Sequence, residues 1–155
     1  MKKLLVVLAA GFLLAGTASA GMFGVYGEWM SGAYASGVGG GVAFDLGALG
    51  VKAGAHFNDL GLSVGGGVSV PIMKGLMDSK LNICADAEFH YVLSGAWEAP
   101  VTGVVEFKLT DNLAVFSGGG MCIFYPYESI DWTTLTITTG IGFSSAFKGG
   151  VKFSL

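Results

Sequence analysis

The segment "LNICADAEFHYVL" (residues 81–93) decides the fold, because its side chains alternate strictly in character. One column is apolar and consists of Leu81, Ile83, Ala85, Ala87, Phe89, Tyr91 and Leu93. The opposite column carries the polar side chains Asn82, Cys84, Asp86, Glu88 and His90. A helical period would scatter these charges around the axis, so the period of two predicts a β-strand.

The same alternation recurs along the chain, for example in "LGVKAGAHF" (49–57) and "VTGVVEFKL" (101–109). Eight strand segments are predicted, at about 22–30, 37–45, 49–57, 61–70, 80–93, 99–109, 113–124 and 135–155. Most of them reach the roughly 9–11 residues that a tilted transmembrane strand needs. The last segment has room for two strands, but its large apolar residues share one parity, so eight strands are favoured and ten remain the alternative.

The first twenty residues are typical of a secretory signal peptide. Lys2 and Lys3 precede the apolar run "LLVVLAAGFLL" (4–14), and the small residues Ala18 and Ala20 occupy the positions that a signal peptidase needs. We therefore expect cleavage after Ala20 and a single domain over residues 21–155, exported from the cytoplasm.

The composition narrows the class of protein further. The chain is 52% hydrophobic and only 12% charged, about half the usual charged fraction. Without Lys2 and Lys3, six lysines oppose eleven acids, which gives the expected mature part a formal charge of −5. This balance argues against nucleic acid as a partner. No apolar run after the signal approaches the roughly 20 residues of a membrane helix. We predict an all-β protein, an antiparallel up-and-down transmembrane β-barrel.

The C-terminal stretch "KGGVKFSL" (148–155) resembles the sorting signal of outer-membrane barrels in its Lys148, Gly150, Phe153 and Leu155. It departs from that pattern by ending in leucine in place of phenylalanine. The mature chain as a whole is similar to the small eight-stranded barrels typified by the OmpA transmembrane domain and OmpX. The resemblance implies the cell outer membrane, with its lipid bilayer, as location. It also implies the secretion pathway and the barrel-assembly machinery as partners during biogenesis. We expect a monomer with no specific ligand yet assignable.

Aromatic side chains gather near the predicted strand ends, as two aromatic girdles at membrane–water interfaces would. The expected outer girdle contains Trp29, Trp97 and Trp132, and the periplasmic one contains Phe23, Phe44, Phe107 and Phe153.

The inward-facing charges are expected to form a network in the barrel lumen. Its predicted members are Glu28, Lys52, His56, Asp86, Glu88, His90, Glu106, Lys148 and Lys152. Counting along the strands predicts a pair between Glu28 and Lys148 across the closing seam, with Lys52, Lys152 and Glu106 in a lower layer. Buried charges are costly unless paired or hydrated, so a structural plug is the main interpretation and a proton or ion path the alternative.

No catalytic, cofactor or metal site is predicted. His56 and His90 are the only histidines, and no tight spacing of metal-ligating residues surrounds them. Cys84 and Cys122 fall on the predicted fifth and seventh strands, too far apart for a disulfide. The expected outer loops are short and acidic, with Asp59, Glu98, Glu128 and Asp131. Residues 71–79 are expected to form an unusually long inner turn.

Three glycine triplets, at 39–41, 65–67 and 118–120, fall within predicted strands. They are expected to leave room for the long lumen side chains opposite. The function expected from all this is non-enzymatic: envelope integrity or a modest surface interaction. The alternative is a narrow ion or water channel. Two remote alternatives are an enzyme that modifies lipid A and a secreted soluble β-sandwich.

Overall fold

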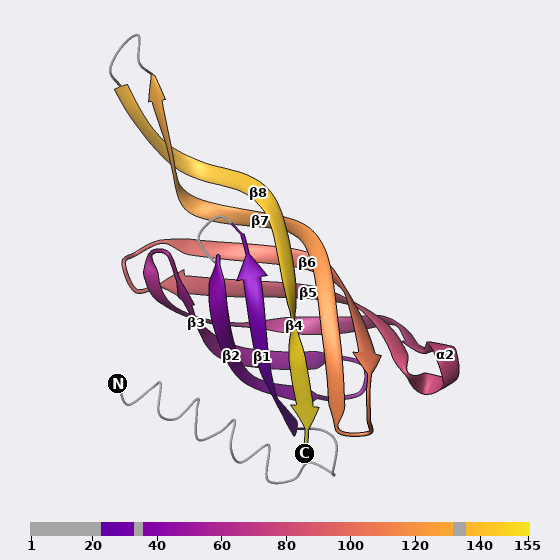
Figure 1. Cartoon of the computed structure of the whole chain (residues 1–155). Coiled ribbons are helices and arrows are strands. Elements are labelled where there is room, and N and C mark those ends of the chain that lie inside the picture. The colour runs from indigo at the N-terminus through magenta and orange to yellow at the C-terminus, as the bar shows by residue number, and fades with distance from the viewer. Residues whose placement is uncertain (1–22, 33–35, 132–135) are drawn as a thin grey trace.

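The computed structural model describes residues 23–32, 36–131 and 136–155, with side chains described outside 127–138. Within these residues, eight antiparallel strands follow one another around a closed barrel (Figure 1). The predicted signal peptide, including Ala18 and Ala20, lies outside the described residues, as does Trp132.

The barrel is built from long strands joined by short connections. The strands are β1 (Phe23–Ser31), β2 (Gly37–Asp45), β3 (Gly50–Asn58), β4 (Gly61–Gly75), β5 (Leu81–Val92), β6 (Trp97–Lys108), β7 (Leu113–Asp131) and β8 (Thr136–Ser154), and the short helix α2 (Leu76–Ser79) joins β4 to β5. Closure comes from β1 and β8, which pair from Gly24↔Ser154 to Ser31↔Phe147. The predicted eight-stranded barrel is confirmed, and the ten-stranded alternative is wrong because β8 is one continuous strand.

Three predicted strand boundaries are wrong. β4 continues to Gly75, five residues past its predicted end, with an irregularity between Pro71 and Met73. β6 begins at Trp97, so residues 94–100 ("SGAWEAP"), the expected outer loop that contains Glu98, are partly strand. β7 continues to Asp131, through most of the outer loop expected at 125–132 ("YPYESIDW"), which contains Glu128 and Asp131. Pro126 does not end β7, because the last β6–β7 pair is Trp97↔Tyr125 and a missing N–H is tolerated where a strand has no neighbour on that side.

The two ends of the barrel differ. One end, which we term the terminal end, holds the start of β1, the end of β8 and the connections β2–β3, β4–β5 and β6–β7. The other, which we term the loop end, holds the remaining connections. β7 and β8 extend as a two-stranded ribbon beyond the loop end (Figure 1). The helix α2 stands out from the wall at the terminal end.

The outside of the barrel is apolar on every strand. Large hydrophobic side chains are exposed around it, among them Val25, Val38, Val51, Val64, Phe89, Val101, Met121 and Phe147, one from each strand. Such a surface is a liability in water, and it is the lipid-facing surface of a transmembrane barrel. No helix in the described residues is long and apolar enough to cross a bilayer.

Candidate functional site

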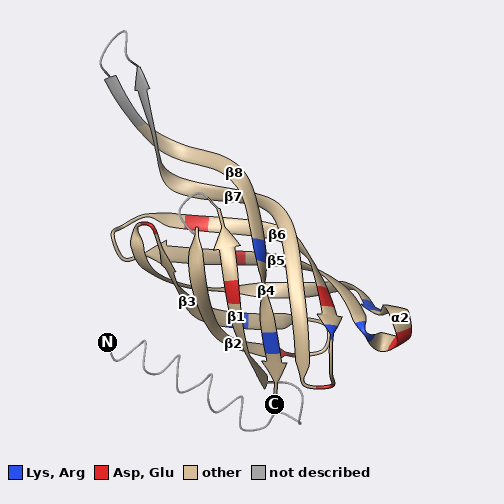
Figure 2. Ribbon diagram, viewed as in Figure 1, with Lys and Arg blue, Asp and Glu red and all other residues tan. Residues whose placement is uncertain are grey.

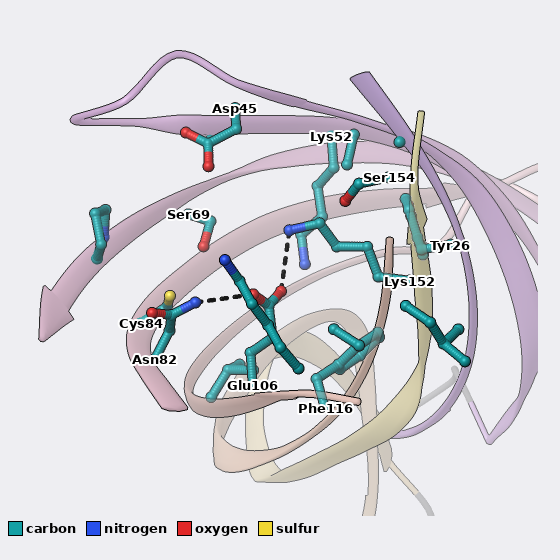
Figure 3. A pocket seen from close by; sticks show the side chains of 18 of the residues that line it. Tyr26, Asp45, Lys52, Ser69, Asn82, Cys84, Glu106, Phe116, Lys152 and Ser154 are labelled. Carbon is teal, nitrogen blue, oxygen red and sulfur yellow. Dashed lines mark hydrogen bonds and ion pairs between the residues drawn. The ribbon is translucent and has the colours of Figure 1, made fainter. Parts of the chain in front are cut away.

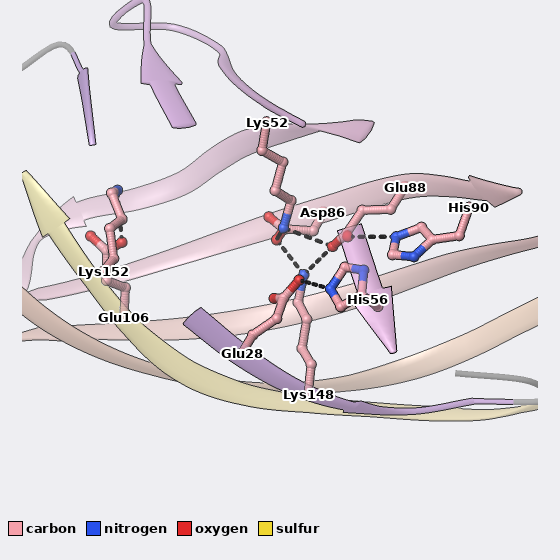
Figure 4. A network of polar contacts seen from close by, with 9 residues as sticks. All are labelled: Glu28, Lys52, His56, Asp86, Glu88, His90, Glu106, Lys148 and Lys152. Carbon is pink, nitrogen blue, oxygen red and sulfur yellow. Dashed lines mark hydrogen bonds and ion pairs between the residues drawn. The ribbon is translucent and has the colours of Figure 1, made fainter. Parts of the chain in front are cut away.

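The centre of the lumen is occupied by a compact network of ion pairs (Figure 4). Lys148 of β8 reaches across to Asp86 and Glu88 of β5, with its Nζ 2.5 Å from an oxygen of each. Lys52 of β3 contacts the same two carboxylates at 2.7 Å. Lys148 is only 2% exposed, so these charges are stabilised by one another and not by bulk water. Buried pairs of this kind are costly to break from one side.

Two histidines extend the network toward the loop end. The Nε2 atom of His56 lies 2.8 Å from Glu28 Oε1, and that of His90 lies 3.0 Å from Glu88 Oε2. The two rings stack with centroids 4.8 Å apart. Each separation is that of a hydrogen bond between an imidazole nitrogen and a carboxylate oxygen. The carboxylates thereby fix the orientation of both rings.

A second, smaller layer lies toward the terminal end. Lys152 Nζ contacts Glu106 Oε2 at 3.0 Å, and Asn82 donates to Glu106 Oε1 at 3.1 Å. Lys152 and Glu106 therefore lie together in the lower layer, as predicted. Lys52 does not join them, because its ammonium extends up to Asp86 and Glu88.

The predicted pair between Glu28 and Lys148 is wrong. In the closing seam Glu28 lies opposite Gly150, and Lys148 lies opposite Met30. Glu28 contacts His56 and Lys148 crosses the lumen to β5. Counting residues from strand ends ignores the stagger between the strands of a closed barrel, which shifts the level of each side chain.

Glycines in the wall make room for this network, as expected from the triplets. A Cβ on Gly65 would lie 3.0 Å from Cα and Cδ2 of His90, and one on Gly67 would lie 2.6 Å from Glu88 Cγ. At Gly39 a Cβ would collide with the ring of His56, and at Gly150 it would lie 2.8 Å from Glu28 Cα. The stacked rings and the carboxylates therefore lie against bare backbone.

Glu98 is a lumen residue that the sequence reasoning placed in an outer loop. It is fully buried, it lies opposite His90 in the β5–β6 register, and Cys122 Sγ donates to it at 3.9 Å. The signal that could have found it was the parity of β6, because Glu98 shares the inward phase of Thr102 and Glu106. The predicted strand starts at residue 99, so Glu98 falls outside it and is not counted among the inward-facing residues.

The two halves of the lumen are filled differently. The loop-end half is packed with buried side chains, including Met30, Ser63, Val92, Ala96, Cys122 and Ala146. The terminal half contains a cavity of about 480 Å³. Tyr26, Asn82, Cys84, Glu106, Phe116 and Lys152 line it (Figure 3), and residues of the connections at the terminal end, such as Asp111 and Asn112, border it. The central network separates the cavity from the packed half.

The predicted girdle residues that the structure describes, all except Trp132, lie near the two ends of the barrel. Trp29 is exposed near the end of β1, at the loop end. The ring of Trp97 stacks on those of Phe89 and Tyr125, with centroid distances of 5.8 Å and 6.2 Å respectively. At the terminal end Phe23 packs on Phe44 at 5.2 Å. Phe107 lies opposite Leu81, and Phe153 lies opposite Leu113.

Other predicted residues are placed as follows. Gly150, Phe153 and Leu155 of the proposed sorting signal lie at the terminal end of β8, and Lys148 belongs to the central network. Cys84 and Cys122 are free thiols on β5 and β7, as expected. Among the described residues, no group of three or more His, Cys, Asp or Glu side chains is arranged to hold a metal ion.

Comparisons with known proteins bear on the fold alone. No family model matches the chain, and no curated protein matches it by sequence. Among solved structures, a chain described as "De novo design of transmembrane beta-barrels" aligns with a TM-score of 0.54 and 17% identity, over 89% of this chain and 98% of the design. An anion-selective porin from Comamonas acidovorans aligns at 10% identity over 77% of this chain and 39% of the porin, but its TM-score of 0.33 carries no argument. The chain therefore has the fold of a closed, eight-stranded transmembrane β-barrel.

Proposed function

We propose that the protein is an integral outer-membrane barrel with a structural role, either in envelope integrity or in a modest interaction at the surface. The observation that carries this proposal is the barrel interior: a central ion-pair network beneath a loop-end half packed with buried side chains. Such an interior supports a role for the barrel as a wall, because ion pairs and buried side chains fill the centre and the loop-end half of its lumen. The apolar exterior supports insertion into the bilayer.

The same interior supports a non-enzymatic role. The side chains that resemble catalytic groups are engaged in structural contacts: His56 with Glu28, and His90 with Glu88. Ser63 Oγ, the hydroxyl beside His56 in the β3–β4 register, donates to the backbone oxygen of His56 at 3.3 Å and not to its ring. A serine nucleophile needs its base within hydrogen-bond reach.

Orientation and biogenesis follow from the same proposal. The terminal end would lie in the periplasm and the loop end outside, after removal of residues 1–20 by the secretion pathway. The end of β8, with Gly150, Phe153 and Leu155, would be read by the barrel-assembly machinery. The protein would act as a monomer, without nucleic acid, and its partner would be the lipid of the outer membrane.

One experiment tests the core of the proposal. Cells expressing the chain are fractionated, and the outer-membrane fraction is run on gels with and without boiling. We expect the protein in that fraction, with a faster band when unboiled, because a folded barrel resists detergent. Recovery in the soluble periplasm, with one mobility, would refute the proposal and support the secreted β-sandwich.

A narrow channel is the second candidate, favoured by the cavity of about 480 Å³ in the terminal half. Planar-bilayer recording of the refolded protein separates the two. We expect no unitary conductance, because the central network and the packed half lie across the path. Stable single-channel steps that persist after removal of minor contaminants would establish the channel and overturn the structural interpretation.

A further inference from the structure

We propose that the β4–β5 hairpin, Ile72 to Lys80, binds glycerophospholipid of the leaflet at the terminal end and so forms a lateral lipid-docking foot. This inference rests on the proposed membrane location and adds a specific surface to it. Figure 1 shows the hairpin and α2 standing out from the wall at that end.

The backbone turns the apolar side chains of this hairpin outward. β4 loses its pairing with β3 after Ser69, opposite Gly50, and continues with β5 alone. Pro71 lies opposite the lumen residue Cys84, whereas Met73 lies opposite Ile83, with the register shift between them. A bulge of this kind places two consecutive residues on one side of a strand. Ile72 and Met73 therefore both face away from the lumen.

The result is a cluster of exposed apolar side chains. Ile72 is 63% exposed, Met73 53%, Leu76 39% and Met77 70%. The cluster continues the lipid-facing column of β4, where Val64, Val68 and Val70 are also exposed. An apolar patch that continues a lipid-facing wall fits acyl chains better than it fits water.

The turn itself holds Met77 in this position. Gly75, Met77, Asp78 and Ser79 all have positive φ, at 73°, 49°, 56° and 69°. For residues with a side chain this conformation is disfavoured and is retained where surrounding contacts impose it. Gly75 N–H donates to Asn82 Oδ1 at 3.1 Å, and Lys80 N–H donates to Met77 O at 3.3 Å. The most exposed apolar residue of the hairpin is thus presented by a strained, hydrogen-bonded turn.

Basic residues flank the apolar cluster. Lys80, in the turn directly before β5, and Lys108, the last residue of β6, are both exposed, and Lys108 N–H donates to Lys80 O at 2.7 Å. Lys74 is tied to the neighbouring connection, with its Nζ 2.6 Å from Gly47 O. Figure 2 shows lysine in the chain on either side of α2 and an acidic residue, Asp78, within α2. Apolar side chains beside lysines match the two parts of a phospholipid, with acyl chains against the former and phosphate against the latter.

The test uses single fluorescent labels on the full-length barrel in vesicles. In a C84S/C122S background, an environment-sensitive probe is attached at Met77→Cys. Val70→Cys, on the exposed wall, is the lipid-exposed control, and Asp111→Cys, in the connection β6–β7, is the aqueous control. Vesicles contain phosphatidylcholine brominated near the glycerol end of the chains, with or without phosphatidylglycerol.

We expect the Met77 probe to be quenched by brominated lipid to at least half the extent seen at Val70, and the Asp111 probe to be quenched by aqueous iodide. Equal iodide access at Met77 and Asp111, with Val70 still quenched by lipid, would overturn the lipid-docking foot while leaving the membrane barrel intact. Loss of lipid quenching at Val70 would overturn the membrane location itself.

The lysines have a separate readout. Phosphatidylglycerol should deepen quenching at Met77, and the double variant K80Q/K108Q should abolish this dependence, whereas K74Q should retain it. If K80Q/K108Q responds to phosphatidylglycerol as the parent does, the lysines do not contact lipid phosphate and that part of the inference is wrong. Heat-modifiable mobility verifies that each variant is folded.

Discussion

Replacing Lys148 by methionine tests whether the central network holds the barrel together. The substitution keeps most of the side-chain volume but removes the ammonium, which contacts Asp86 and Glu88. Both carboxylates are buried. Removing one partner of a buried pair typically costs about 3–5 kcal/mol, because the other partner stays buried without its counter-charge.

The structure places the expected loss in the lower part of that range. Lys52 remains 2.7 Å from both carboxylates and continues to compensate them. A loss of about 3 kcal/mol lowers the folding equilibrium constant roughly 100-fold.

Lys152→Met is the matched control, because it makes the same change four residues later on the same face of β8. Its pair with Glu106 is partly open to water, with side chains 28% and 16% exposed. Ion pairs at such sites are typically worth about 0.2–1 kcal/mol. We therefore expect K148M to lower the urea midpoint of unfolding clearly more than K152M does.

The assay is unfolding in urea, followed by gel mobility without boiling and by tryptophan fluorescence. The double variant K148M/D86N should lose less free energy of unfolding than the sum of its single variants, because it removes a charge that K148M leaves uncompensated. Equal losses in K148M and K152M, or strict additivity in the double variant, would refute the reasoning.

Three further predictions follow from named contacts. Gly65→Ala places a Cβ that collides with Phe89 O and lies 3.0 Å from His90 Cα, and it should cost about 1–3 kcal/mol by overpacking. Gly103→Ala, whose nearest neighbour would be 4.0 Å away, should leave the urea midpoint within error of the parent. Equal effects would contradict the role of the triplets. Cys84, which lines the cavity, should react with a small thiol reagent in the folded barrel, whereas Cys122, which is fully buried, should react only after unfolding. Peptide mapping identifies the labelled thiols, and labelling of Cys122 before Cys84 would contradict the prediction. Phe153→Ala should slow accumulation of the heat-modifiable form in cells, while Phe143→Ala, at a position exposed on the same face of β8, should not. Pulse-labelling measures the rate of accumulation of each variant, and equal rates would argue against the sorting signal.

The alternation of polar and apolar residues predicts the wall because each strand has one face in lipid and one in the lumen. This period identified all eight strands, and it identified nine charged or histidine residues that the structure places in the lumen. It did not identify Glu98, which the predicted strand start at residue 99 left in an outer loop although the residue lies opposite His90 in the lumen.

Which charges pair with which could not be predicted in the same way. A partner is chosen by the level of a side chain in the lumen, and this level depends on the stagger between strands. The error at Glu28 and Lys148 has this origin, since the seam register sets them two residues apart. The extension of β7 through Pro126 was also missed. Proline lacks the N–H that a strand with two neighbours needs, but beyond Tyr125 β7 has no pairing with β6.

The β7–β8 ribbon at the loop end separates the closure of the barrel from the connection between its last two strands. The closed wall reaches to the start of β6, at Trp97↔Tyr125, and to the end of β1, at Ser31↔Phe147, whereas β7 and β8 pair on to Asp131↔Thr136. The wall therefore does not depend on the length of the connection between these two strands. Foreign peptide inserted between Asp131 and Thr136 would be carried on a hairpin outside the ring of eight, so the chain offers a compact scaffold for displaying sequences at a membrane surface.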